Sequence, residues 1–249
     1  MEEELKALEQ TREKQEHGLT MTQALKNMSR SDIRSPFLLI TANFSLVLFA
    51  GPFAIIYYGI EIFQDVGIDA NEHLAAIIVA AIRVIGGFIA IFLIKRVPRL
   101  KHVMVSMSLM SLSMAVLGGV MYMKELGFEN PGLRILPIIC VTIYMFSFGA
   151  GAGPLQWVFM GELLPPDYKV LSGIISSISV AEVFIITKIF PTLLVVLKPY
   201  GTYWLFAGIS FGSNIFYATL MPETRGMSML EIRQLFLGTQ QVMKNTIQI

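Results

Sequence analysis

The sequence predicts an all-α, multi-pass membrane protein, and three observations lead to this fold class. First, 54% of its 249 residues are hydrophobic and only 15% are charged, a composition too apolar for a soluble domain of this size. Second, six segments hold about 20 mainly apolar residues, the length that a helix needs to cross a bilayer: 37–60, 74–94, 103–123, 135–159, 171–196 and 202–221. Third, the connections between these segments are short, so we expect neighbouring helices to run antiparallel.

Polar residues flank this apolar region at both ends. Residues 1–36 are rich in Glu, Lys and Arg, with apolar residues at roughly helical spacing. This pattern predicts an amphipathic helical segment on the cytosolic face, and a solvated, partly disordered tail is the alternative. The segment has no apolar h-region, so we expect no cleavable signal peptide. The bundle is predicted over 37–221 and a cytosolic tail over 222–249.

Basic residues predict the orientation of the bundle. Lys and Arg are frequent before the first span and in the loop 95–101, whereas the segment 64–73 on the opposite side has none. Because cytosolic loops carry the excess of Lys and Arg, both termini are expected in the cytosol. We expect a multi-pass protein of the plasma membrane.

Several function classes are poorly supported. The chain has one cysteine, Cys140, and three isolated histidines, which leaves no internal disulfide and no Cys/His metal site. A net charge of +1 argues against a nucleic-acid partner. No nucleophile and base stand at workable spacing, and no glycine loop is suited to hold a phosphate. We therefore expect no enzyme activity, no catalytic residue, no metal and no cofactor.

The fourth span is interrupted near its middle. In the stretch 149–169, glycines and Pro154 break the apolar helix, Trp157 follows the break, and Glu162 comes where charged residues resume. Broken backbone is tolerated in lipid only where protein or a water-filled cavity satisfies it, so a binding element is expected here. A flexible helix with a proline kink is the alternative. The pair Gly51-Pro52 interrupts the first span in the same way, which divides the segments into two sets of three.

Two charged residues fall inside the predicted spans. Arg83 lies near the middle of the second span and Glu182 near the middle of the fifth, where an ionised side chain costs at least ~2.5 kcal/mol unless it faces protein or water. Both lie about 16–17 Å from the cytosolic ends of their helices at a rise of ~1.5 Å per residue. We therefore predict an Arg83–Glu182 ion pair, direct or through water. The rival prediction is that each charge pairs with protein outside this chain, and Lys188 is expected to reach the outer headgroups.

Three motifs in order resemble the sugar-porter branch of the major facilitator superfamily. Residues 222–226, PETRG, resemble the family's PETKG signature after the last membrane helix. Residues 153–157, GPLQW, followed by Glu162, resemble the G-P-x-x-W…E pattern of the tenth family helix, and 57–63 resembles the YY…IF pattern of the seventh. The resemblance covers the second half of that family, from the helices that link the halves to the tail. Within the branch, the chain is most similar to insect trehalose-transporter-like proteins.

The resemblance implies a fold, a function and two sets of residues. The fold is six transmembrane helices that form one half of a major facilitator fold, as two three-helix repeats. The function is transport of a small, sugar-like organic solute by alternating access. Together with the two intramembrane charges, it gives a substrate site of Trp157, Gln156, Gly153, Phe53, Tyr57, Arg83 and Glu182. It also gives a cytosolic gate of Arg96, Arg99, Glu162, Lys169, Glu223 and Arg225, for which a role in helix orientation alone is the alternative.

The sequence departs from the family where sugar hydroxyls are bound. Val47, Leu48 and Phe53 stand where the seventh family helix has a Gln-Gln pair and an Asn. A pocket without these amides leaves sugar hydroxyls unpartnered, so ordinary hexose recognition is expected to be lost or altered. The loop 95–101 also departs from the family's acidic-Arg-x-Gly-Arg-Arg pattern.

Two function classes remain open from the sequence. One is a transporter whose partners are a small solute, the lipid bilayer and a missing N-terminal six-helix half. The other is a non-transporting or incomplete half-transporter that acts as a sensor or partner subunit. The family encloses its substrate between two six-helix halves, and this chain supplies six spans. Six further spans in frame upstream would favour the transporter.

Overall fold

The structure is a computed structural model of the chain, and it describes residues 31–66, 72–128, 135–164, 168–227 and 231. Within these ranges the chain forms helices and no strand, which confirms the all-α prediction. Most of the predicted amphipathic segment 1–36 and of the predicted tail 222–249 lies outside the described residues, so both stay predictions.

The described residues form six helical segments, of which two are interrupted. The first consists of α3 (Ser31–Phe49) and α4 (Pro52–Val66). The fourth consists of α7 (Leu136–Ser147), a π-helical turn (Phe148–Ala152) and α8 (Gly153–Leu163). The continuous helices are α5 (Glu72–Arg96), α6 (Arg99–Glu125), α9 (Lys169–Val196) and α10 (Lys198–Thr219).

Length and composition allow these segments to cross a bilayer. Five of the described segments are both long enough and apolar enough to do so, and they include the two interrupted ones. The sixth, α10, has 22 residues. At ~1.5 Å per residue it measures about 33 Å, which also spans a hydrocarbon core of ~30 Å.

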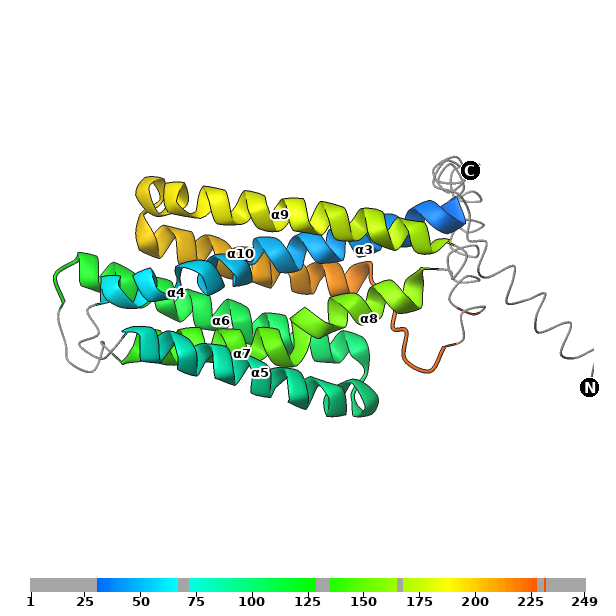
Figure 1. Cartoon of the computed structure of the whole chain (residues 1–249), viewed down its shortest axis with the longest axis horizontal. Helices are drawn as coiled ribbons and strands as arrows, with labels where there is room; N and C mark the ends of the chain where they lie inside the picture. The colour runs from blue at the N-terminus through cyan, green and yellow to red at the C-terminus, as the bar shows by residue number, and fades with distance from the viewer. Residues whose placement is uncertain (1–30, 67–71, 129–134, 165–167, 228–230, 232–249) are drawn as a thin grey trace, which may run out of the picture.

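The helices pack as two interleaved sets of three (Figure 1). In one set are α3–α4, α5 and α6, and in the other are α7–α8, α9 and α10. The leading helix of each set packs against the second helix of the other, α3 on α9 and α7 on α5, while α6 lies along α10. Two similar three-helix repeats produce this exchange of partners, and it agrees with the predicted repeat arrangement.

The first interruption has a clear steric and polar cause. Gly51 adopts a φ of 96°, in the left-handed region that favours glycine, and a Cβ there would lie 2.6 Å from the Phe206 ring of α10. The chain then resumes with Pro52 at the start of α4. The Tyr144 hydroxyl of α7 donates a 2.8 Å hydrogen bond to the Ala50 carbonyl, so the carbonyl beside the break keeps a partner.

Candidate functional site

The second interruption brings α7 and α8 close to α5. Gly149 lies in the π-helical turn, and a Cβ on it would lie 2.4 Å from the carbonyl oxygen of Arg83. On the other side of the turn, a Cβ on Gly151 would lie 2.4 Å from the Cβ of Ser106 on α6. The glycines of the sequence 148–152 are therefore required because two neighbouring helices touch the backbone there.

Two polar side chains of α6 bind the backbone of this turn. The Ser106 hydroxyl donates to the Ser147 carbonyl at 2.7 Å and accepts from the Ala152 N–H at 3.0 Å, so it bridges both sides of the π-helical turn. Nε2 of His102 donates to the Ala150 carbonyl at 2.8 Å. Interrupted backbone inside a membrane needs such partners. These hydrogen bonds from α6 stabilise the break and hold the start of α8 in place relative to the end of α7.

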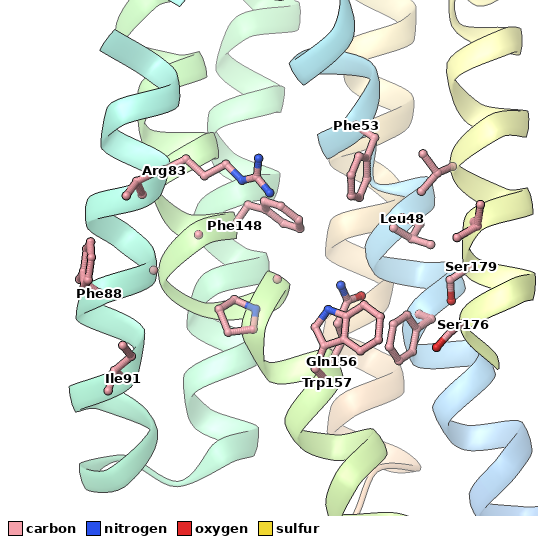
Figure 2. Close-up of a pocket in the computed structure, with 18 residues that line it drawn as sticks. Leu48, Phe53, Arg83, Phe88, Ile91, Phe148, Gln156, Trp157, Ser176 and Ser179 are labelled. Atoms are coloured by element: carbon pink, nitrogen blue, oxygen red, sulfur yellow. The ribbon is translucent and has the colours of Figure 1, made fainter. Parts of the chain in front are cut away.

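A cavity of about 820 Å³ lies beside this break (Figure 2). Its walls come from α3, α4, α5, the π-helical turn, α8 and α9. It is lined by Phe44, Leu48, Phe53, Arg83, Val84, Gly87, Phe88, Ile91, Phe148, Gly149, Gly153, Pro154, Gln156, Trp157, Ser176, Ser179, Val180 and Val183. A volume of this size accepts a small organic molecule.

Five of the residues predicted for the substrate site line this cavity: Trp157, Gln156, Gly153, Phe53 and Arg83. The Trp157 side chain is 50% exposed, and its ring meets Phe44 edge-on with centroids 5.1 Å apart. Gln156 is buried, and its Oε1 atom has no hydrogen-bond partner among the described residues. Side chains of α4, α5 and α8 thus converge on one space.

Arg83 carries the charge of this cavity. Its guanidinium lies over the Phe148 ring, with Cζ 5.5 Å from the ring centroid, a cation–π arrangement. Figure 2 shows the side chain extending from α5 across Phe148 toward the interior of the cavity. The sequence predicted Arg83 near the middle of its span, and the structure adds the aromatic ring beneath its guanidinium.

The structure places the other two predicted substrate residues outside this cavity lining. Glu182 lies in α9, where Oε1 accepts a 2.5 Å hydrogen bond from the Ser45 hydroxyl of α3. Within the described residues no direct ion pair joins Arg83 to Glu182, which corrects the prediction of a direct pair. Tyr57 is 65% exposed and does not line the cavity, while its neighbour Tyr58 packs against Phe190 at 5.1 Å.

The three residues that differ from the sugar-binding amides of the seventh family helix do not all face the cavity. Leu48 and Phe53 line the cavity, whereas Val47 is fully buried in the helix core. The lining residues that sequence reasoning missed include three aromatic residues and a hydroxyl group, namely Phe44, Phe88, Phe148 and Ser176. For Ser176 a signal existed, because with Ser179 and Val183 it shares one helical face at spacings of three and four residues.

A second cluster joins the helix ends at one end of the bundle. We call it the clamp and define it as Arg99, Glu162, Glu223, Thr224 and Arg225. Glu223 accepts hydrogen bonds from the backbone N–H groups of Arg99 and Leu100, each at 3.0 Å. The N-cap position of α6 is Pro98, which offers no side-chain cap, so Glu223 satisfies the free donors and complements the helix dipole.

Arg225 plays the matching role at the neighbouring helix end. Its Nη1 and Nη2 atoms donate to the carbonyls of Arg96 and Lys95 at 2.8 and 3.1 Å, where α5 ends. Two residues of the 222–226 motif, an acid and a base, thus cap a helix N-terminus and a helix C-terminus. Arg96 contributes its carbonyl rather than its side chain to this contact.

The remaining clamp contacts reach α8. Nη2 of Arg99 lies 2.5 Å from Oε1 of Glu162, and both side chains are largely covered, with 17% and 27% exposed. The Thr224 hydroxyl donates to Oε2 of Glu162 at 2.6 Å, a contact that the sequence did not reveal. The clamp therefore brings together four of the six residues predicted for the cytosolic gate, namely Arg99, Glu162, Glu223 and Arg225. The side chain of Lys169 lies outside the described part of the structure.

Comparison with known proteins identifies the same family as the sequence motifs do. The family model described as "Sugar (and other) transporter" matches residues 1–236. The chain is 32% identical over 239 residues to the facilitated trehalose transporter Tret1-2 homolog of Drosophila sechellia, covering 96% of this chain and 49% of that protein. It is 35% identical over 205 residues to trehalose transporter 1 of Drosophila melanogaster, covering 81% of this chain and 24% of that protein.

A solved structure shows the same fold. The major facilitator superfamily proton:xylose symporter XylE, bound to 6-bromo-6-deoxy-D-glucose, superposes with a TM-score of 0.65 at 22% identity, over 86% of this chain and 46% of that one. The chain thus spans about half or less of the length of the relatives it matches. These matches agree with the broken helices, the cavity and the clamp. They show that the chain belongs to the sugar (and other) transporter family, with the fold of one half of a major facilitator superfamily protein.

Proposed function

We propose that the protein is a membrane transporter that moves a small, sugar-like solute by alternating access, and that this chain is its C-terminal half. The observation that carries the proposal is the cavity beside the broken fourth segment, into which α8 presents Trp157 and Gln156. Broken helices that meet at a central cavity are the usual construction of substrate sites in transporters with internal repeats. The relatives named as trehalose transporters and as a xylose symporter support a sugar-like solute.

The second half of the transporter would complete the cavity. The helices α5 and α9 border the cavity and are the least buried spans, with 17% and 22% of their most apolar windows covered. An N-terminal six-helix half packed on these two helices would cover that apolar surface and enclose the solute between the halves. The length of the relatives supports such a half, since this chain covers 49% of one and 24% of another.

The clamp supplies a gate at one end of this path. Its contacts tie the ends of α5, α6 and α8 to residues 223–225, so parting them would let the helix ends separate. The distribution of Lys and Arg supports a cytosolic location for this end and for both termini. We place the protein in the plasma membrane. No covalent step is needed, so the proposal includes no catalytic residue.

Solute counterflow tests the proposal. The protein is expressed with all coding sequence contiguous with this chain in a host that lacks sugar transport, and reconstituted vesicles are preloaded with unlabelled solute. We expect labelled solute to accumulate transiently and saturably, because a carrier exchanges solute across the membrane without an ion gradient. Absence of counterflow for every sugar and sugar derivative, with normal amounts of protein in the membrane, would instead support a sensor or partner subunit.

A further inference from the structure

Arg83 is a cation in the cavity whose counter-charge is missing from the part of the chain that the structure describes. Its contact is with the Phe148 ring, and no ion pair involves it among the described residues. No acidic residue stands among the described residues that line the cavity. The other intramembrane charge, Glu182, is bound to Ser45 outside the cavity lining. The cavity is therefore electropositive.

A guanidinium at this depth requires compensation. An arginine near the centre of a membrane span is unfavourable unless it faces water or an opposite charge. The Phe148 ring provides a weak, non-directional part of this compensation, since a cation–π contact satisfies none of the five N–H donors of arginine. These donors remain available for a planar anion, to which a guanidinium binds with two parallel hydrogen bonds.

The remaining wall of the cavity offers mainly aromatic and aliphatic surface, which suits the apolar face of a ring. Aromatic rings of Phe44, Phe53 and Trp157 line it together with aliphatic side chains. The hydroxyl protons of Ser176 and Ser179 are donated to carbonyls of their own helix at 2.8 Å, so neither hydroxyl is free to donate to a solute. A neutral sugar would bury several hydroxyl groups against these surfaces without partners.

We propose that the solute is a small organic anion, with a single carboxylate or similar charge on a ring-shaped body that has an apolar face. Arg83 binds the charge, and Trp157 with Phe53 contacts the apolar face. The amide of Gln156, whose Oε1 lacks a partner, accepts a hydroxyl or N–H group of the solute. This inference rests on the proposed transport function and specifies the chemistry of its solute. Sugar acids and aromatic carboxylates share this chemistry, and the experiment separates them.

Uptake of four labelled probes tests the inference: glucuronate, benzoate, glucose and trehalose. The protein is again expressed with all contiguous coding sequence in a transport-deficient host. We expect saturable uptake of glucuronate, benzoate or both to exceed that of the neutral sugars. Arg83→Met should lower anion uptake about tenfold or more, as loss of a charge-assisted pair of hydrogen bonds does, and should leave any neutral uptake nearly unchanged. Arg83→Lys should retain part of the anion uptake.

Lys188→Met is the matched control for loss of a membrane cation. Lys188 is exposed on α9 and does not line the cavity, so its removal should not alter the ratio of anion to neutral uptake. The amount of each variant at the cell surface is measured alongside, and uptake is expressed per transporter. A change in this ratio cannot arise from poor folding alone, since misfolding lowers uptake of both kinds of solute equally.

Two uptake results would overturn the inference, and a third would contradict transport and pass the decision on the anion site to a binding measurement. Glucose or trehalose uptake that exceeds anion uptake would leave the transport function standing while removing the anion site. An equal loss of anion and neutral uptake in Arg83→Met would assign Arg83 to a protein carboxylate in the other half. No uptake of any probe would contradict transport, and quenching of tryptophan fluorescence by glucuronate or benzoate then decides the site separately. Quenching that Arg83→Met abolishes supports the anion site, and its absence in the parent protein overturns it.

Discussion

The Arg99 guanidinium and the Glu162 carboxylate lie 2.5 Å apart and join the beginning of α6 to the end of α8. The second oxygen of the same carboxylate accepts the Thr224 hydroxyl at 2.6 Å, so Glu162 links three segments that are distant in the sequence. Because α8 also carries Trp157, this contact connects the cavity wall to the clamp through one short helix.

The first prediction concerns the strength of this connection. Arg99→Gln and Glu162→Gln should each lower the free energy of unfolding, because each leaves a largely covered charge without its partner. The double substitution should recover part of the loss, with a coupling of about 0.5–3 kcal/mol in a double-mutant cycle. Unfolding of the purified protein in detergent measures this. Strictly additive effects would show that the pair contributes nothing to holding the helix ends together.

The second prediction isolates the Thr224 hydroxyl. Thr224 is 3% exposed, so Thr224→Val keeps its shape and removes only the hydrogen bond to Glu162. We expect a loss of roughly 1–3 kcal/mol of stability, since the largely covered carboxylate of Glu162 loses one of its two donors. Thr224→Ser is the matched control, because it keeps the hydroxyl, and it should lie close to the parent protein. Equal stabilities of the Val and Ser variants would argue against a role for this bond.

The third prediction tests the close approach at the π-helical turn. Gly149→Ala places a Cβ 2.4 Å from the Arg83 carbonyl oxygen, so α5 and the π-helical turn must move apart. Overpacking of this kind costs ~1–3 kcal/mol or more, and the folded yield should fall. Gly119→Ala on α6 is the control, since a Cβ there meets no atom within 4 Å. Size-exclusion profiles and melting temperatures of the two variants provide the comparison, and indistinguishable behaviour would contradict the packing described for the break.

The fourth prediction concerns the two intramembrane charges. Ser45→Ala and Glu182→Gln should be coupled in a thermal-stability cycle, because the hydroxyl binds the carboxylate at 2.5 Å. Arg83→Met and Glu182→Gln should instead be additive to within about 0.5 kcal/mol, as residues without shared partners are. If the coupling between Arg83 and Glu182 exceeds about 0.5 kcal/mol, the prediction of a water-mediated pair is supported again.

The sequence was sufficient to predict the fold class because its strongest signals recur along the whole chain. The apolar spans indicate the number of helices, and the two glycine-proline breaks indicate where helices are interrupted. The motif 222–226 marks the connection after the last helix. Arg83, Phe53 and Trp157 line one cavity, and the resemblance supplied the arrangement of helices that periodicity cannot give.

What the sequence could not give was the rotation of each helix. Arg83 and Glu182 have similar predicted depths because depth follows from the rise per residue. Their direction depends on packing, and Glu182 binds Ser45 of α3 while Arg83 lies over Phe148. Tyr57 likewise faces away from the cavity lining, and the backbone of its neighbour Tyr58 is non-helical. The partners of the π-helical turn come from α6, far along the chain, and no local pattern marks them.

The central claim is that the cavity beside the broken helix is the transport site, and solute uptake by Trp157→Ala tests it most directly. Trp157 is half-exposed and lines the cavity, so its truncation should lower uptake at least several-fold while surface expression stays near that of the parent. Phe211→Ala is the control, because Phe211 is an exposed aromatic residue on α10 outside the cavity lining, and uptake by this variant should be unchanged. Unchanged uptake of every transported solute by Trp157→Ala would contradict the account.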